Sequence, residues 1–477
     1  MPSPHDAAPE TESGPRMSTL SRDRASGPTT PAGGGRTSIV RVVVASVVGT
    51  AVEWYDFFLY GSAAALVFGT LFFPSSDPLT GTLLAFGTYA LGFVARPLGG
   101  IVFGHYGDRV GRKRMLVVSL FMMGAATVAI GLLPTYSSIG VAAPILLVLC
   151  RLVQGFAVGG EWGGAVLMVA EHGTDERRGF WSSWPQAGVP LGNLLATAVL
   201  WLLATVQSDE AFNAWGWRIP FLLSAVMVLI GLWVRLSLED SPVFAEAKAE
   251  IEARGAGHVP ILEVVRRYPR EVLLAMGMRM AENISYYVFT IVVITYVTTY
   301  LGAPRNAVLG ALLLGAGLQF LVIPLLGALS DRVGRRPLYL VGAIGVGVWG
   351  FVFFPLVDTL ESGPILLAVL VGLFFHALMY APQAAFFSEL FGTSVRYTGA
   401  SVGYQLASIF AGALAPIIAL ELLGPVDARN TFAVGVYLAI ASVVTVVSVL
   451  LARETRASSL RHDRVLPGAD LPTRSTR

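Results

Sequence analysis

Long apolar runs separated by short charged segments dominate this sequence and restrict what it can fold into. The chain is 54% hydrophobic and 13% charged, whereas soluble domains carry roughly 25% charged residues. Runs of about 18 or more apolar residues are typical of membrane-spanning helices. Twelve such runs can be counted, at 41–68, 81–105, 114–133, 142–171, 179–204, 217–236, 272–301, 306–329, 338–357, 363–388, 396–421 and 431–452. The pattern predicts an all-α membrane protein with twelve transmembrane helices.

The segments outside these runs predict the domain boundaries. Residues 1–38 are rich in Pro, Gly, Ser and Thr and lack an apolar core, and residues 455–477 are similar, so both are expected to be disordered tails. Segment 237–271 is charged and has helical periodicity, which predicts a linker with a short amphipathic helix on the membrane surface. The ranges 39–236 and 272–454 remain, and each holds six predicted spans.

The distribution of Lys and Arg predicts the side of the membrane on which each loop lies. If the N-terminus is placed inside, only Arg218, Arg305 and Arg429 of the 33 basic residues fall in outer loops. Short cytoplasmic loops of membrane proteins carry an excess of basic residues. Both tails and the linker are therefore expected in the cytoplasm, with the bundle in the inner, plasma membrane of the cell.

Several classes of function are disfavoured by the composition. The net charge of +2 is too small to indicate nucleic-acid binding, and the single cysteine, Cys150, excludes an intramolecular disulfide. We find no phosphate-binding loop, no spacing typical of metal ligands and no Ser–His–Asp or Cys–His arrangement. We therefore expect no cofactor, no metal and no enzymatic activity, and any transport should not be driven by ATP.

One charged phrase occurs twice in corresponding places, as GHYGDRVGRKR at 104–114 and GALSDRVGRRP at 327–337. Asp108 and Asp331 are placed to accept hydrogen bonds from a neighbouring helix N-terminus or to pair with Arg. Gly111 and Gly334 suit a tight turn. A single copy would fit a simple basic turn on the cytoplasmic side. Two copies, each between long apolar runs, indicate a duplicated architecture.

This repeated loop resembles the one found in the major facilitator superfamily, between the second and third helices and again between the eighth and ninth. The resemblance covers residues 40–455. It implies two pseudo-symmetric six-helix bundles with a substrate cavity between them near the middle of the membrane. It also implies a gating role for residues of the loop. In this sequence those residues are Asp108, Arg109 and Arg112, and in the second copy Asp331, Arg332 and Arg335.

Five further phrases are similar to the metabolite:proton symporter branch of that superfamily. They are VEWYDFFLYG at 52–61, RPLGG at 96–100, RLVQGFAVGGEWGGA at 151–165, WGWRIPF at 215–221 and VRYTGASVGYQ at 395–405. The branch includes carriers of shikimate, α-ketoglutarate, citrate and proline or betaine. The pairing of EWYDF with GGEWGGA is most like shikimate-type members. The resemblance implies a carrier that moves a small metabolite together with a proton.

Two carboxylates lie three residues apart in the first span. Glu53 and Asp56 share one face of a helix near the middle of the membrane. An ionisable group there costs roughly 2.5–3.5 kcal/mol on insertion scales unless it is paired or hydrated. Two close carboxylates repel each other, which favours a proton on one of them. We expect at least one, Asp56 ahead of Glu53, to carry the coupled proton, the alternative being a structural partner of a buried Arg.

The fourth span supplies further candidates. Arg151 and Gln154 belong to an RxxQG pattern that resembles a signature of proton-coupled members of the superfamily. Arg151 could pair with Asp56 or Glu53 in one state and with a substrate carboxylate in another, or form a static buried pair. Glu161 lies among glycines and could serve as a second proton relay or as an acceptor at a packing site.

The seventh span carries a polar face that is unsuited to lipid. Arg279, Glu282 and Tyr286 share that face, with Asn283 and Tyr287 beside it, so we expect them to line the cavity. Arg279 and Glu282 could also form an internal pair. Weaker candidates for substrate contact are Gln186, Tyr404 and Gln405.

Two other polar residues within spans are expected to have structural roles. Arg96 is placed near the cytoplasmic end of the second span, where its side chain would reach the membrane surface or the repeated loop. His376 in the tenth span is expected to be a hydrogen-bonded packing residue.

The function favoured by these observations is proton-coupled symport by a monomer in the lipid bilayer. The expected cargo, taken up by alternating access, is a small organic acid such as shikimate or a related hydroxy- or keto-acid. One alternative is an osmolyte symporter for proline or betaine, although the tail after Arg453 lacks the heptads of a coiled coil. The other is a drug efflux pump, which the polar seventh span disfavours.

Overall fold

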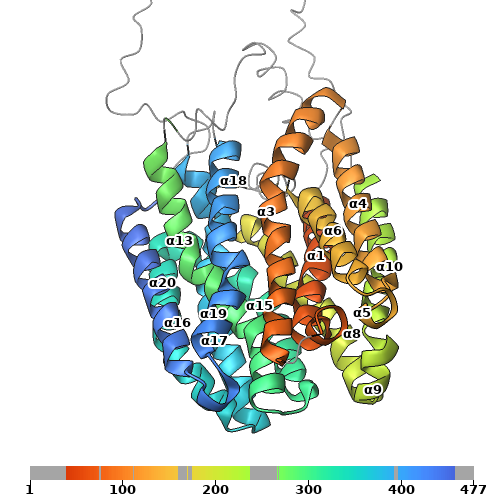
Figure 1. Cartoon of the computed structure of the whole chain (residues 1–477). Helices are drawn as coiled ribbons and strands as arrows, with labels where there is room; N and C mark the ends of the chain where they lie inside the picture. Colours follow the sequence, from red (N-terminus) through yellow and green to blue (C-terminus); the bar gives the residue numbers. More distant parts are fainter. Residues whose placement is uncertain are drawn as a thin grey trace, which may run out of the picture. The chain divides into compact units, whose positions relative to one another are not determined.

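The computed structural model describes residues 39–74, 77–110, 112–159, 169, 174–236, 266, 268–391 and 396–456. Within these residues every regular element is helical (Figure 1). The longer helices are α1 (Ile39–Ala63), α3 (Pro78–Val110), α4 (Arg112–Leu132), α6 (Ala142–Val158), α8 (Arg178–Val206), α10 (Arg218–Leu236), α13 (Pro269–Tyr287), α15 (Arg305–Val333), α16 (Arg335–Asp358), α17 (Ser362–Leu390), α18 (Arg396–Ala407), α19 (Ala415–Leu423) and α20 (Thr431–Leu451). Short helices are α2 (Gly69–Phe72), α5 (Tyr136–Ile139), α9 (Asp209–Ala211) and α14 (Val293–Thr295).

Most of these helices have the length and composition of membrane spans. In the described part of the chain nine are long and apolar enough to cross a bilayer, and a tenth candidate is the bent pair Asp209–Gly216 and Arg218–Val234. Two shorter apolar helices, Val117–Leu132 and Ala142–Val158, lie where the third and fourth spans are predicted. The all-α membrane fold predicted from the sequence is confirmed. In Figure 1 most helices before Leu236 lie on the right, and most after Pro269 on the left.

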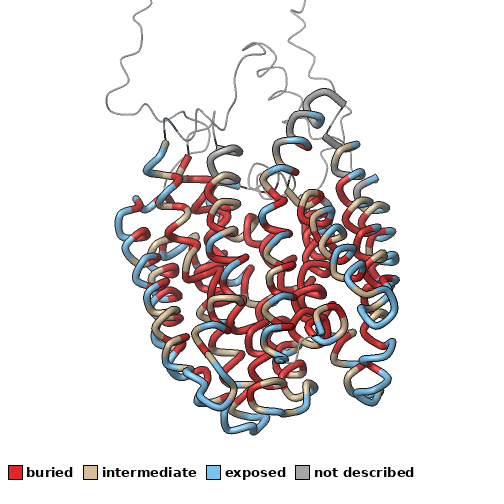
Figure 2. Tube along the Cα trace, viewed as in Figure 1, coloured by how far each residue is buried: buried red, intermediate tan, exposed pale blue. Residues whose placement is uncertain are grey.

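The interior holds a large apolar core together with buried polar side chains, and many large apolar side chains are also exposed. The buried positions gather in the middle of the bundle, and the exposed ones face outward (Figure 2). Large apolar side chains such as Leu98, Phe121, Trp233, Leu325 and Phe432 are more than half exposed, as expected where lipid is the solvent.

Two segments occupy the centre and carry most of the polar candidates. Ile39–Phe72 is 78% buried over its most apolar stretch, and Pro269–Tyr300 is 94% buried. Both depart from α-helical geometry after their polar residues, with π-helical turns at Ala64–Phe68, Val288–Val292 and Tyr296–Tyr300. Such turns are frequent at functional sites.

A row of glycines joins α3 to α6. A Cβ on Gly155 would overlap the carbonyl oxygen of Gly92, and a Cβ on Gly159 would overlap the carbonyl oxygen of Arg96. Likewise a Cβ on Gly99 would overlap the carbonyl oxygen of Phe156. The two backbones therefore touch directly, which is the close approach that small residues permit in membrane helices. We call this contact the α3–α6 seam.

The repeated phrases differ from the predicted loops. In the first copy α3 continues to Val110 and α4 begins at Arg112, and in the second α15 ends at Val333 and α16 begins at Arg335. The charged residues therefore lie on helix ends, where first-turn N–H groups and last-turn carbonyls can bind them. Gly334 has a φ of 103°, so the predicted tight turn is confirmed there. Gly111 and most of the predicted linker 237–271 lie outside the described residues.

Candidate substrate and proton site

Asp56 lies on α1 and is held by two hydroxyl groups. Thr127 on α4 donates to Oδ2 at 2.8 Å, and Ser224 on α10 donates to Oδ1. The side chain is 2% exposed. Among the described residues no Arg or Lys lies within ion-pair distance of this carboxylate. The buried Asp56 side chain is therefore stabilised by hydrogen bonds from two hydroxyl groups and not by an ion pair.

A chain of hydrogen bonds connects Asp56 to Arg151. The Arg151 Nη1 donates to Gln154 Oε1 at 3.2 Å, and the Gln154 Nε2 donates to Thr127 Oγ1 at 2.6 Å. Thr127 in turn donates to Asp56. The sequence left open a direct pair between Arg151 and Asp56. The structure instead interposes Gln154 of α6 and Thr127 of α4.

Aromatic rings surround the Arg151 guanidinium. Its Cζ lies 4.9 Å from the centroid of Phe57, 4.3 Å from Tyr60 and 4.7 Å from Tyr89. A Cβ on Gly92 would lie 2.7 Å from Arg151 Nε, so a side chain there would displace the guanidinium. Cation–π contacts stabilise the charge only partly.

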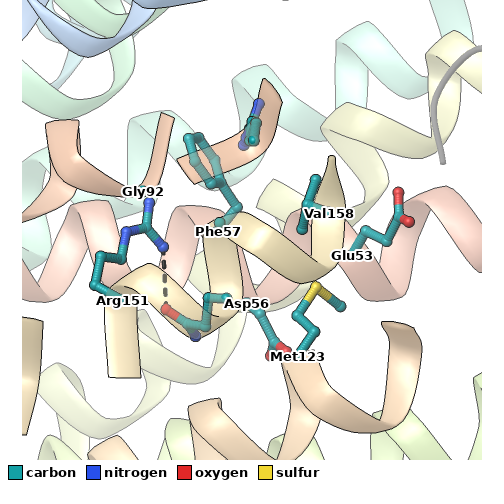
Figure 3. Close-up of a pocket in the computed structure, with 10 residues that line it drawn as sticks. Glu53, Asp56, Phe57, Gly92, Met123, Arg151 and Val158 are labelled. Atoms are coloured by element: carbon teal, nitrogen blue, oxygen red, sulfur yellow. Dashed lines mark hydrogen bonds between the residues drawn. The ribbon is translucent and has the colours of Figure 1, made fainter. Parts of the chain in front are cut away.

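A cavity opens beside these groups, and Glu53 and Asp56 both line it. Its other lining residues are Phe57, Gly92, Arg96, Met123, Arg151, Gln154, Gly155 and Val158. Figure 3 shows the Glu53 side chain directed away from Arg151, on the far side of the drawn site. We call this space the arginine cavity.

Arg96 is a member of this site that the sequence did not predict. It is 4% exposed, far from the surface position expected for it. Its Cζ lies 4.6 Å from the centroid of Phe57, 4.5 Å from Phe93 and 5.8 Å from Trp54. The physical reason is that α3 extends to Val110, so Arg96 lies roughly 20 Å along the helix from that end.

The polar face of α13 forms a second cluster, centred on Glu282. The Glu282 carboxylate lies 3.5 Å from Arg279 Nη1 and accepts a hydrogen bond from Gln383 at 3.1 Å. Arg279 also donates to Gln383 and to Ser408, at 3.1 and 3.2 Å, and stacks 3.4 Å from the centroid of Tyr404. The predicted internal pair is thus present, and the positive charge of Arg279 is compensated.

His376 belongs to the same cluster through its contact with Glu282. Its Nε2 lies 3.2 Å from Glu282 Oε1, and its Nδ1 lies 2.8 Å from Gln319 Nε2. That amide also donates to the Leu373 carbonyl at 2.9 Å, so its nitrogen must face both groups. The Nδ1 therefore accepts, and the Nε2–H donates to Glu282. His376 is bonded as expected, but it also faces a cavity.

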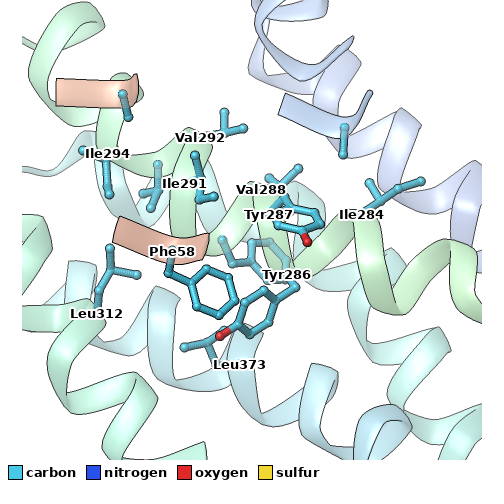
Figure 4. Packing of buried hydrophobic residues seen from close by; sticks show 14 of the residues in the cluster. Phe58, Ile284, Tyr286, Tyr287, Val288, Ile291, Val292, Ile294, Leu312 and Leu373 are labelled. Atoms are coloured by element: carbon cyan, nitrogen blue, oxygen red, sulfur yellow. The ribbon is translucent and has the colours of Figure 1, made fainter. Parts of the chain in front are cut away.

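This second cavity, the tyrosine cavity, is lined from both halves of the chain. Its lining residues are Trp54, Phe58, Val189, Arg279, Glu282, Asn283, Tyr286, Tyr287, His376, Tyr380 and Tyr404. Figure 4 shows the rings of Phe58 and Tyr286 beside each other, and their centroids are 5.4 Å apart. Asn193 donates to the Tyr286 hydroxyl at 3.1 Å. Trp54 lines the tyrosine cavity and also contacts Arg96, so the two cavities adjoin.

The remaining candidates for substrate contact fall less centrally. Gln186 is fully buried and donates to the Tyr380 carbonyl at 3.4 Å. Tyr404 lines the tyrosine cavity, whereas Gln405 lines neither of the two cavities. Glu161 and the side chains of Asp108, Arg109 and Arg112 lie outside the described residues.

Ion pairs join the two halves at the end where α1 begins and α20 ends, here called the terminal end. Asp331 accepts hydrogen bonds from the first N–H groups of α8, at Gly179 and Phe180, with distances of 2.7 and 2.9 Å. It also pairs with Arg335 at 2.7 Å. Both contacts predicted for this aspartate are therefore confirmed, and the helix N-terminus supplies the complementary partial charge. Arg332 is exposed.

Glu389 is a second centre at the terminal end that the sequence did not predict. Its buried carboxylate binds Arg178 at 2.8 Å and Arg335 at 3.2 Å, and it accepts a hydrogen bond from Thr455 at 2.6 Å. Arg178 comes from the first half of the chain, and the other three residues come from the second. No sequence pattern predicts this centre, because its members are far apart along the chain.

Glu454 binds the first turn of α16 beside this centre. Partial burial raises its pKa, but backbone N–H donors at Arg335, Arg336, Arg456 and Thr455 outweigh that effect and hold the pKa below its usual range.

The two halves also meet at the opposite end. Arg305 at the start of α15 pairs with Asp209 just after α8. A Cβ on Gly61 of α1 would lie 2.5 Å from Ile291 Cδ1, which shows how closely the segments approach there. The two halves of the chain are therefore in contact at both ends.

Comparisons with known proteins agree with this architecture. The family model described as Major Facilitator Superfamily matches residues 47–402 and 284–472. The chain is 42% identical over 417 residues to a shikimate transporter of Escherichia coli, covering 87% of this chain and 95% of that protein. It is 42% identical over 428 residues to an inner membrane metabolite transport protein of Escherichia coli, covering 88% and 95%.

The solved structure of the xylose transporter from Escherichia coli in a partially occluded inward-open conformation shares the fold. The TM-score is 0.66 at 20% identity, over 88% of this chain and 99% of that one. The family match, the relatives and the shared fold thus agree with one another. The chain belongs to the Major Facilitator Superfamily and is a multi-pass membrane transporter, not an enzyme.

Proposed function

We propose that this protein is a proton-coupled symporter that takes up a small organic acid, such as shikimate or a related hydroxy- or keto-acid. It works by alternating access, as a monomer with twelve spans in two six-helix bundles and both termini in the cytoplasm. The observation that carries the proposal is the environment of Asp56, a buried acid bound by two hydroxyls beside an arginine that no described carboxylate neutralises.

Both protonation states of Asp56 have hydrogen-bonding partners in this environment. A hydroxyl can donate to a carboxylate or accept from a carboxylic acid. The hydroxyl of Ser224 can therefore turn from donor to acceptor when Asp56 takes up a proton. Glu53 lines the same cavity and is the second candidate for the proton.

Coupling between proton and substrate follows from the chain of hydrogen bonds to Arg151. A proton on Asp56 removes the nearby negative charge, which makes the Arg151 guanidinium a stronger site for a substrate carboxylate. The substrate and the proton then favour the same loaded state, which symport requires.

The tyrosine cavity supplies the groups that would recognise the body of such a substrate. Asn283, Tyr286 and Tyr287 can form hydrogen bonds with ring hydroxyls, and Phe58 and Trp54 present apolar faces.

Gating belongs to the terminal end in this proposal. The contacts of Asp331, Arg335 and Glu389 hold α8 against the second half, so they must break for the cavities to open there. Asp108, Arg109 and Arg112 are assigned the same role by resemblance, and Arg332 with them.

Uptake into proteoliposomes containing the purified protein tests the proposal. Labelled shikimate is added with an inward proton gradient, with and without a protonophore, together with a panel of hydroxy- and keto-acids. The proposal predicts accumulation that the protonophore abolishes. Uptake that the protonophore leaves unchanged would refute the coupling, and failure of every acid in the panel would refute the substrate class.

A second candidate is symport of a zwitterionic osmolyte such as betaine, favoured by the aromatic lining of the tyrosine cavity. Trp54, Phe58, Tyr286, Tyr380 and Tyr404 all line it, and aromatic faces bind quaternary ammonium groups. Including betaine and proline in the same uptake panel distinguishes the two candidates.

A further inference from the structure

Two guanidinium groups lie near one aromatic ring at the arginine cavity. Arg96 Cζ and Arg151 Cζ are 4.6 and 4.9 Å from the centroid of Phe57. Both residues line the cavity, and both are buried, with exposed fractions of 4% for Arg96 and 2% for Arg151. Arg96 comes from α3 and Arg151 from α6, so two different helices bring their charges to one space.

Neither charge is neutralised by a neighbour in the way that Arg279 is. Arg279 has Glu282 at 3.5 Å. In the described part of the chain no carboxylate lies within 4 Å of the nitrogen atoms of Arg96 or Arg151, although Glu53 and Asp56 line the same cavity. A buried charge without a close partner is costly in a membrane and marks a functional site.

Both side chains also have unused donors. The Nε of Arg96 and the Nε and Nη2 of Arg151 are buried without a hydrogen-bond acceptor among the residues that the structure describes. A buried donor left unsatisfied costs free energy that a bound acceptor would recover. A carboxylate is the acceptor that best matches a guanidinium in charge and geometry.

The position of Arg96 also fits a ligand that extends into both cavities. Arg96 contacts Trp54, and Trp54 lines the tyrosine cavity. A small acid with its carboxylate at the two arginines would therefore direct its body towards Asn283, Tyr286 and Tyr287.

We propose that Arg96 and Arg151 together bind the carboxylate of the transported acid, so that Arg96 is a specificity-determining residue that requires a negatively charged group. This inference rests on the proposed function in one respect, namely that the cargo is an organic acid. It adds a residue on α3 and a reason why the neutral form of the same molecule is rejected.

The test compares an acid with its neutral ester on purified protein. Binding of shikimate and of methyl shikimate is measured by the quenching of tryptophan fluorescence, without a proton gradient, for the wild type, Arg96→Gln and Arg96→Lys. Charge-assisted hydrogen bonds predict that the wild type binds the acid roughly 10- to 100-fold more tightly than the ester. In Arg96→Gln this ratio should fall about tenfold, because the charged acid loses more affinity than the neutral ester.

Two further variants control the comparison. Arg270→Gln removes an exposed arginine at the start of α13, remote from both cavities, and should keep the wild-type ratio. Arg96→Lys keeps the charge but loses the planar fork, so its ratio should lie between those of the wild type and Arg96→Gln. If Arg96→Gln does not fold, the lysine variant decides the question.

The outcomes separate this inference from the proposed function. A wild type that does not prefer the acid refutes the organic-acid cargo itself. A wild type that prefers the acid, with the full ratio retained in Arg96→Gln or in Arg96→Lys, refutes the role of Arg96 alone.

Discussion

Replacing Asp56 with Asn tests the coupling mechanism most directly. Asparagine has nearly the same shape, and its oxygen can accept from one of the two hydroxyls while its nitrogen donates to the other, once that hydroxyl turns. The change in the free energy of unfolding should therefore be small, about 1 kcal/mol. The group can no longer exchange a proton, so the variant should lose coupling while it keeps its fold.

The size of the effect follows from one carboxylate carrying one proton. A pH difference of one unit is worth about 1.4 kcal/mol per proton, which supports roughly tenfold accumulation of substrate. A monoanion that moves with one proton carries no net charge, so the membrane potential should add nothing. Asp56→Asn should lower the accumulation ratio from about ten to about one.

The assay is uptake of labelled acid by proteoliposomes across a fixed pH difference, with exchange of labelled for unlabelled substrate measured in parallel. Exchange should persist in Asp56→Asn, which shows that the variant still binds and transports. Asp77→Asn, at an exposed carboxylate in the loop before α3, is the matched control and should accumulate substrate like the wild type. Tenfold accumulation by Asp56→Asn would refute the reasoning.

Three other predictions concern the gate and the packing. Glu389→Gln removes a buried charge that faces two arginines, which should destabilise the closed terminal end by about 3 kcal/mol. A water-soluble maleimide should therefore label a cysteine introduced by Ser183→Cys faster in the Glu389→Gln background than in the protein with Glu389 intact. Gly155→Ala should lower the unfolding temperature by several degrees, whereas Gly87→Ala, with open space around it, should not. Glu454→Ala should cost about 0.5–1 kcal/mol, as measured by thermal unfolding, because it removes the acceptor for the first N–H groups of a helix. The pKa of the Glu454 carboxylate is lower in the folded protein than in the unfolded chain. The difference in unfolding free energy between the wild type and Glu454→Ala should therefore be complete above about pH 4.5 and shrink as the pH falls.

The features that depend on local sequence pattern could be predicted. The apolar runs predicted the helices. The repeated phrase predicted both contacts of Asp331, because helix ends and charge pairs are determined by short stretches of sequence. The polar face of α13 was predicted from helical spacing alone, and the structure places its members on one cavity.

Features that depend on distant residues were not predictable in the same way. The buried position of Arg96 is not evident from the sequence, because the apolar run ends before the helix does and α3 continues to Val110. Glu389 belongs to no recognisable sequence motif, because its partners Arg178 and Arg335 are 211 and 54 residues away along the chain. The separation of Asp56 from Arg151 by two hydrogen-bonded side chains depends on how α4 packs, which a linear pattern does not report.

The α3–α6 seam has a consequence for how the carrier can move. Because backbone touches backbone at Gly92, Gly99, Gly155 and Gly159, the two helices cannot slide or roll against each other without collision. They should travel through the cycle as one stiff unit, with the guanidinium groups of α3 and α6 at a constant separation. The part of the carrier proposed to bind the anion would then keep the same shape throughout the transport cycle. Changes in the shape of the arginine cavity must then come from the other helices that line it, α1 and α4.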